Sequence, residues 1–179
     1  MVYREVFTSN KGMYLTALSN MDTDKDIADI TVYDTEKFSI INTLKKVPYG
    51  IGGTRCAISD DGKYLVGCSY RKRKGMVLYN LQTSKKLWTN KDYTKIQTLQ
   101  FSNDNQYIIV STEWGECYFI SVETGEEIKY ISGRKVFENN YGEDIIIERK
   151  EVKIGETRIE AMASCLTAIA FASIVLISD

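Results

Sequence analysis

The sequence predicts an all-β protein made of successive four-stranded antiparallel sheets, and three observations lead to this prediction. One turn motif recurs three times, a second turn motif follows each copy of the first, and β-branched and aromatic residues flank the turns. Tight polar turns between such residues are typical of β-hairpins. Two hairpins in succession supply the four strands of one sheet.

The first motif occupies residues 7–18, 58–68 and 101–111, which read FTSNKGMYLTAL, ISDDGKYLVGC and FSNDNQYIIVS. Each copy has an apolar residue, a polar turn, a tyrosine and an apolar run. The turn residues are mostly Asn, Asp and Gly, which tolerate a left-handed backbone and form side-chain hydrogen bonds with nearby main chain. Each copy therefore predicts a strand, a tight turn and a second strand.

The second motif occupies residues 30–44, 76–89 and 117–131. Each copy gives an apolar strand, a polar turn and another apolar strand, with the turns of the last two copies at residues 82–85 and 123–126. Together the two motifs predict one four-stranded unit that is repeated along the chain.

The spacing of the repeat defines the predicted units. Tyr14, Tyr64 and Tyr107 recur at roughly 40 to 50 residues, which is the period of a propeller blade. The longer first interval predicts a long loop around residues 20–26. We expect a single domain over residues 1–179, with blades at about 1–49, 50–95 and 96–135 and a degenerate fourth at 136–179.

The runs SDDGKYLVGC with VLYNLQTSKKLW, and SNDNQYIIVS with YFISVETGEEI, resemble blades of the WD-repeat and related bacterial β-propeller families over residues 1–131. There is no Gly-His pair, and the strands that would end in Trp-Asp end in Tyr33-Asp34, Tyr79-Asn80 and Ile120-Ser121. The resemblance therefore implies blade geometry rather than membership of one subfamily.

The number of units predicts whether the blades can close into a ring. Propellers usually close a ring of about four to eight blades, so three to four blades predict an incomplete ring or one that associates with a second copy.

Residues 161–178, AMASCLTAIAFASIVLIS, carry no charge. We interpret this apolar segment as a buried element that covers an open edge, and a membrane anchor is the alternative, since about 20 apolar residues span a bilayer.

Composition excludes several classes of function. The chain has 23 Lys and Arg against 24 Asp and Glu, so no nucleic-acid partner is expected. Histidine is absent, which excludes Ser-His-Asp and Cys-His catalysis.

The cysteines are widely spaced, and their spacing predicts reduced thiols at Cys56, Cys68, Cys117 and Cys165. With no secretory signal in the first residues, we expect a cytoplasmic protein.

One acidic segment invites comparison with a calcium-binding loop. Asp22, Asp24 and Asp26 alternate as in the first half of such a loop. Ile27 stands where that loop needs glycine, and Tyr33 stands at the position of the bidentate acid. The sequence therefore predicts no metal site, and it contains no recognisable cofactor motif or catalytic residue set.

The candidate binding residues lie in two loops that join the second and third strands of their units, and we expect both loops at one rim of the array. They are Tyr70, Arg71, Lys72, Arg73 and Lys74 in the second unit and Trp114 in the third. Cations suit acidic protein surfaces and a tryptophan at a rim suits a binding hot spot. The alternatives are a solvated turn that discourages edge pairing for the cations and a blade-packing role for Trp114. Trp88, by contrast, is predicted to be core.

These features predict a non-catalytic protein-interaction module, either a scaffold or an inhibitory binding protein of the immunity type, whose partner is another protein. A membrane-tethered sensor or adaptor anchored by residues 161–178 is the alternative. An enzyme that uses carboxylates alone is the weaker alternative.

Overall fold

The structure is a computed structural model that describes residues 5–50, 56–69, 74–131, 135–138, 144–148, 151–154 and 157–160. These residues form four antiparallel four-stranded sheets, and no helix occurs among them. The prediction of an all-β protein with successive sheets is confirmed. In each sheet the strands are hydrogen-bonded in their order along the chain, so every connection within a sheet is a hairpin.

The first sheet contains β1 (Glu5–Thr8), β2 (Tyr14–Asp22), β3 (Ile27–Asp34) and β4 (Ser39–Pro48). The second contains β5 (Cys56–Ile58), β6 (Tyr64–Cys68), β7 (Met76–Asn80) and β8 (Lys86–Asn90). The third contains β9 (Ile96–Phe101), β10 (Tyr107–Thr112), β11 (Cys117–Ser121) and β12 (Glu127–Ile131). The fourth contains β13 (Lys135–Glu138), β14 (Asp144–Glu148), β15 (Glu151–Ile154) and β16 (Thr157–Glu160).

The longer first unit does not contain the long loop that its spacing predicts. The extra residues lengthen the strands instead, since β2, β3 and β4 have 9, 8 and 10 residues, whereas β6, β7 and β8 have 5 each. Asn20, which the prediction placed in the loop, lies within β2, where the pairing with β3 shifts register between Ser19 and Asp22. A bulge accommodates the extra residues without breaking the hairpin.

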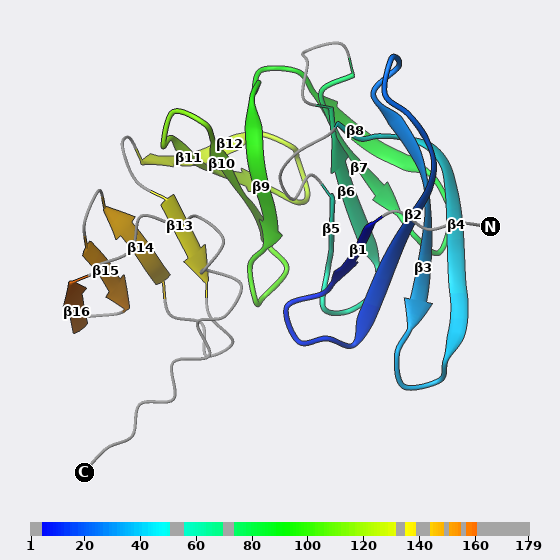
Figure 1. Cartoon of the computed structure of the whole chain (residues 1–179), viewed down its shortest axis with the longest axis horizontal. Helices are drawn as coiled ribbons and strands as arrows, with labels where there is room; N and C mark the ends of the chain where they lie inside the picture. The colour runs from blue at the N-terminus through cyan, green and yellow to red at the C-terminus, as the bar shows by residue number, and fades with distance from the viewer. Residues whose placement is uncertain are drawn as a thin grey trace.

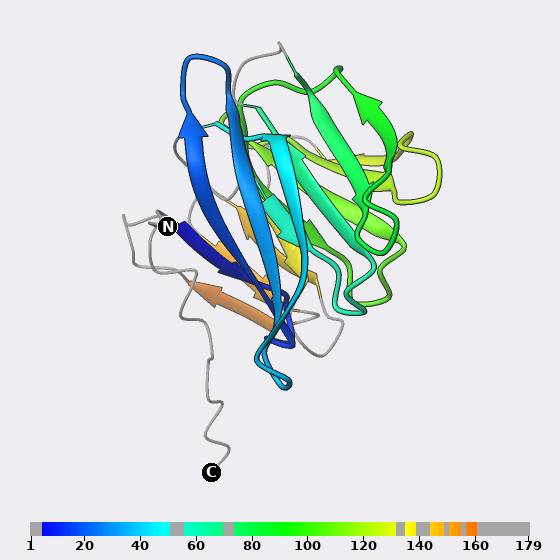
Figure 2. The ribbon, with the colours of Figure 1, turned by 90° about the vertical axis from the view of Figure 1, so that its right-hand side faces the viewer.

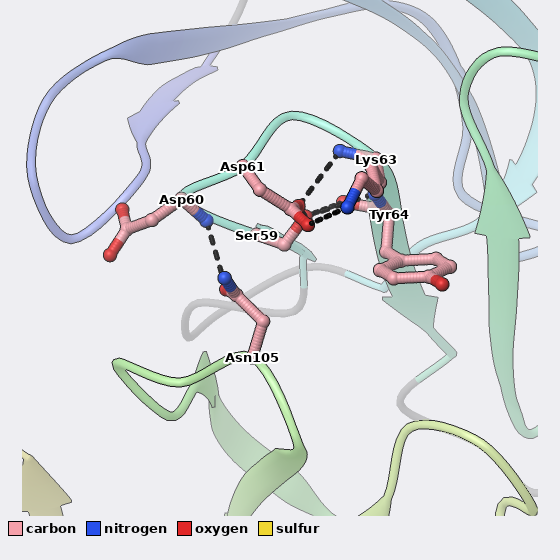
Figure 3. Close-up of polar contacts among 6 residues, drawn as sticks. All are labelled: Ser59, Asp60, Asp61, Lys63, Tyr64 and Asn105. Carbon is pink, nitrogen blue, oxygen red and sulfur yellow. Dashed lines mark hydrogen bonds and ion pairs between the residues drawn. The ribbon is translucent and has the colours of Figure 1, made fainter.

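The turn between the first two strands is built in the same way in three sheets. A serine donates its backbone N–H to the carbonyl of the tyrosine five residues on, at 2.9 to 3.0 Å in Ser9, Ser59 and Ser102. The serine Oγ accepts the N–H of the same tyrosine. In the second and third sheets the serine hydroxyl also donates to an aspartate carboxylate, that of Asp61 or Asp104. Figure 3 shows this arrangement around Ser59.

The first three sheets stack face to face, and apolar side chains fill the spaces between them. One core cluster between the first and second sheets includes Leu18, Ile30, Val32, Leu65 and Leu81. A second cluster between the second and third sheets includes Leu78, Ile96, Phe101, Ile108 and Ile120. Trp88, predicted to be core, is half-buried and packs against the second cluster. Burial of these faces is the main force that holds adjacent sheets together.

The first strands of consecutive sheets lie on the inside of the array. β1 is in contact with β5, and β5 is in contact with β9. The fourth strands lie at the outer edges of their sheets. Figure 1 shows the first and fourth sheets at opposite ends of the molecule, and Figure 2 shows the outer face of the first sheet turned toward the viewer. The described sheets therefore form an open array.

Polar contacts between turns reinforce the stacking. The N–H of Lys11 donates to the Asp60 carboxylate at 2.9 Å, and the N–H of Asp60 donates to Asn105 Oδ1 at 3.1 Å (Figure 3). The Asn10 amide reaches past the second sheet and donates to the Phe101 carbonyl at 2.8 Å. The three turns thus form one connected layer at one rim.

The outer strands make a second set of contacts with the next sheet. The Asn42 amide of β4 donates to the Leu81 carbonyl and to Ser84 Oγ in the turn between β7 and β8. At the equivalent place in the next sheet, Trp88 Nε1 donates to the Val122 carbonyl at 2.9 Å. The outer strands β4 and β8 are therefore each anchored to the last turn of the next sheet.

Buried cysteines provide a test of this packing. Cys56, Cys68 and Cys117 are buried thiols, and burial raises the pKa of the Cys56 thiol to about 12. Because the thiolate is the reactive form, we expect a Cys165→Ser protein to react with a thiol reagent at pH 8 at least about 1000-fold more slowly than in denaturant. Rapid labelling of all three thiols in the native protein would contradict the packing described here. Cys165 itself lies outside the described residues.

Candidate functional site

The structure describes two of the six predicted binding residues. Tyr70, Arg71, Lys72 and Arg73 lie outside the described residues, whereas Lys74 and Trp114 are exposed. Lys74 lies between β6 and β7, and Trp114 lies between β10 and β11, as predicted. Because these two residues lie in equivalent hairpins of adjacent sheets, Lys74 and Trp114 belong to the same rim of the array.

Local hydrogen bonds hold the Trp114 loop in one shape. Gly115 has a φ of +75° and donates its N–H to the Thr112 carbonyl at 3.2 Å. The N–H of Thr112 donates to the Glu116 carbonyl at 3.0 Å, and the N–H of Glu113 donates to the Lys95 carbonyl, also at 3.0 Å. A loop fixed in this way loses little conformational entropy when it binds a partner.

The Trp114 side chain is 68% exposed and carries a cation on its ring. Lys95 Nζ lies 4.4 Å from the centre of the indole and 3.8 Å from Glu113 Oε2. Exposed cation–π contacts and surface ion pairs each contribute about 0 to 1 kcal/mol. A partner could therefore displace Lys95 at little cost, which leaves the indole available as a contact surface.

A tyrosine cluster beside this loop was not predicted. The Tyr118 ring lies 4.5 Å from that of Tyr93 and 5.0 Å from that of Tyr130, centre to centre. Tyr118 and Tyr130 are directly paired across β11 and β12, so the repeat pattern could have identified this pair. Tyr93 lies in the connection between β8 and β9, and no periodicity indicates where its side chain goes.

Carboxylates face the tyrosine hydroxyls of this cluster. Tyr93 donates its hydroxyl to Glu127 Oε2 at 3.0 Å. Burial, together with a hydrogen bond to Glu116, raises the pKa of Tyr118 to about 12. Burial and the Glu127 carboxylate also raise the pKa of Tyr93. Tyr130 is half exposed at the edge of the cluster.

The acidic segment considered for calcium is a hairpin loop between β2 and β3. Asp22 forms an ion pair with Lys25 at 2.7 Å, and Asp26 has a left-handed backbone with a φ of +50°. Within the described parts of the chain, no group of three or more acidic or cysteine side chains is placed to hold a metal ion.

The apolar segment at residues 161–178 lies outside the described residues, so its two interpretations stay predictions. Elsewhere in the chain, the described residues contain no helix with the length and apolar character needed to cross a bilayer.

Comparisons with known proteins concern the fold. No family model matches this chain, and no curated protein does. Among solved structures, the chain is similar to a chain of the hydrazine synthase of Kuenenia stuttgartiensis, with 17% sequence identity and a TM-score of 0.51. The match covers 81% of this chain and only 42% of that chain. At this identity the likeness shows a shared arrangement of strands and nothing about activity.

Proposed function

We propose that the successive sheets are blades of a propeller-type array and that the chain is a non-catalytic protein-interaction module, either a scaffold or an inhibitory binding protein. The stacked antiparallel sheets support the propeller assignment, with their first strands inside and their fourth strands outside. The resemblance of residues 1–131 to WD-repeat-like blades supports it as well.

The observation that carries the proposed function is the presentation of Trp114. Its indole is 68% exposed, although hydrogen bonds fix the loop that bears it. Large aromatic side chains displayed on a rigid scaffold are typical of binding hot spots. The adjacent loop, with Arg71 to Lys74 in its sequence, would add positive charge at the same rim.

The experiment is affinity capture from the native cell with the wild-type chain and with Trp114→Ala. Truncation of a hot spot costs about 2 kcal/mol or more, so we expect the Kd for the partner to rise at least about thirtyfold, and capture below saturation to fall accordingly. Arg71→Gln combined with Arg73→Gln should weaken capture further, and more strongly at low salt, because exposed charges are screened.

Leu87→Ala is the matched control, because Leu87 is a 48% exposed apolar residue of β8, away from this loop. It should capture as much partner as the wild type. If Trp114→Ala and the arginine variants also leave capture unchanged while circular dichroism shows a folded protein, the rim is not the binding surface.

A further inference from the structure

The tyrosine pair on the outer half of the third sheet has no counterpart in the first two sheets. Tyr118 of β11 lies directly opposite Tyr130 of β12, and the two ring planes are tilted by 33°. By the register of the repeats, the equivalent pairs are Val77 with Thr89 in the second sheet and Thr31 with Thr43 in the first. The second sheet stacks on the first without aromatic residues at these positions, so the stacking does not require the tyrosine pair.

Carboxylates converge on this pair and on Tyr93, which packs against Tyr118. Glu116 accepts a hydrogen bond from Tyr118, and Glu127 accepts the Tyr93 hydroxyl at 3.0 Å. Burial is the largest cause of the raised pKa of Tyr118, and the Glu116 and Glu127 carboxylates both raise it further. Burial also comes first for Tyr93, whose pKa the carboxylates of Glu127 and Asp92 raise further. Three negative charges therefore act on the same group of rings.

The three carboxylates have no cationic partner in the part of the chain that the structure describes. None of the ion pairs there includes Asp92, Glu116 or Glu127. Carboxylates gathered around a partly buried site repel one another, and the potential that they create attracts a positive charge. The cluster is therefore suited to a cationic ligand.

The lysines of the third sheet and of the connection that leads into it are placed elsewhere. Lys95 lies over the Trp114 ring, and Lys129 lies 5.0 Å from the centre of the Phe119 ring. Because neighbouring strand residues point to opposite faces, Phe119 and Lys129 lie on the face of the sheet away from the tyrosine pair. Lys91 is exposed and forms no ion pair with any described carboxylate.

The surface of the cluster is open to a ligand. Tyr130 is 45% exposed, Glu127 is exposed, and Tyr118 and Glu116 are half-buried. A tyrosine face attracts a cation placed within about 6 Å of its centre, and more strongly where water is excluded. Arginine fits such a surface better than lysine, because its planar guanidinium stacks on a ring while its N–H groups donate to carboxylates.

The tyrosine pair is joined to the Trp114 loop by Glu116. The Glu116 carboxylate accepts the hydroxyl of Thr112 at 3.2 Å, and Thr112 and Trp114 belong to the same turn. That turn already places a cation on an aromatic ring beside a carboxylate, through Lys95, Trp114 and Glu113. The tyrosine pair offers the same combination of rings and carboxylates at the same end of β11.

We propose that this surface binds an arginine-rich segment of the partner protein. We call it the cation surface, and it consists of Tyr118, Tyr130, Glu116 and Glu127. The inference rests on the proposed function and names the chemistry of the partner where it meets the third sheet. Charge complementarity favours a basic segment, because an acidic or apolar segment would leave the carboxylates uncompensated.

The experiment measures, by fluorescence anisotropy at physiological salt, how tightly the full chain binds two labelled peptides. One alternates arginine with glycine, and the other has lysine in place of arginine. The arginine peptide should bind more tightly, because lysine has the same charge but no planar group to stack on the rings. Tyr130→Thr introduces the residue that both other sheets have at that position. It should weaken binding of the arginine peptide about fivefold and reduce the difference between the peptides.

Glu116→Gln combined with Glu127→Gln removes two charges but keeps oxygen atoms that accept the tyrosine hydroxyls. It should weaken binding of the arginine peptide at least about tenfold. The matched control is Glu36→Gln combined with Glu123→Gln, which removes the same charge from exposed residues between β3 and β4 and between β11 and β12. The control should bind nearly as tightly as the wild type.

The proposal is wrong if neither peptide binds, if both bind equally, or if the control loses as much affinity as the site variants. A rise in affinity when Arg71 and Arg73 become glutamine, in the wild type but not with Tyr130→Thr, would assign the surface to the chain's own basic loop and would also overturn it. The proposed function is tested separately. If Trp114→Ala leaves capture of the partner unchanged while peptide binding still depends on Tyr130, the Trp114 contact fails and the cation surface stands.

Discussion

Replacing Phe101 with alanine should lower the free energy of unfolding by about 4 kcal/mol. Phe101 is 1% exposed at the end of β9, within the cluster between the second and third sheets. The substitution leaves a cavity where two sheets meet, and the rigid backbone of stacked sheets limits collapse into it. Chemical denaturation followed by circular dichroism measures the change.

Two controls separate the packing of Phe101 from a general sensitivity to substitution. Phe101→Leu keeps most of the buried volume and should cost less than about 2 kcal/mol. Leu87→Ala, at a half-exposed position of β8, should change stability by less than about 0.5 kcal/mol. A loss below about 1 kcal/mol for Phe101→Ala would show that the second and third sheets do not share the core described here.

The same variant reports on cooperativity between the sheets. In a repeat array, stability is approximately the sum of the units and of the interfaces between neighbours. Phe101 also accepts the Asn10 amide through its carbonyl, which links the third sheet to the first. If Phe101→Ala uncouples the sheets, the denaturant dependence of unfolding should become shallower, because less surface is exposed in each step.

The sequence predicts the hairpins of this fold because their signals are local. Ser59, Asp61 and Gly62 form a tight turn through contacts within six residues, so the pattern in the sequence is sufficient to place it. The fourth sheet, from Lys135–Glu138 to Thr157–Glu160, is likewise built from consecutive hairpins. Local turn chemistry and the alternation of strands thus account for element order and sheet composition.

The sequence does not predict features that depend on how two sheets meet. In the sequence Asn42 is an ordinary polar residue of an outer strand, yet its amide donates hydrogen bonds to the turn between β7 and β8 of the next sheet. The outer strands of three sheets share one bulge, at Ile41, Leu87 and Ile128, which no turn signal marks. Such contacts join residues far apart in the chain, and their partners are known only when the sheets are placed.

In the candidate site too, the sequence predicts local features but not the contacts made by residues from another sheet. The sequence predicts that Trp114 lies in a hairpin loop, but it leaves open whether the side chain is exposed or packs on a blade, and the structure shows it exposed. The position of Lys95 over the indole does not follow, because Lys95 belongs to the connection from the preceding sheet. The packing of Tyr93 against Tyr118 depends on that same connection.

Gly125→Ala should lower the free energy of unfolding by about 3 kcal/mol. Gly125 has a φ of +75°, where an alanine side chain costs about 1 to 2 kcal/mol. A Cβ added there would also lie 2.8 Å from Cδ2 of Trp88, a residue of β8 in the second sheet that packs against this turn. The Trp88 ring would have to move, and its hydrogen bond to the Val122 carbonyl would weaken.

Gly12→Ala is the matched control, because Gly12 has a φ of +71° and an added Cβ would meet nothing within 4 Å. It should cost only the backbone strain, about 1 kcal/mol. The excess in Gly125→Ala therefore measures the collision with Trp88. In a Trp88→Ala background, Gly125→Ala should therefore lower the free energy of unfolding by no more than Gly12→Ala does in the wild type. Equal costs with and without the indole would mean that Trp88 does not anchor the second sheet to the third through this turn.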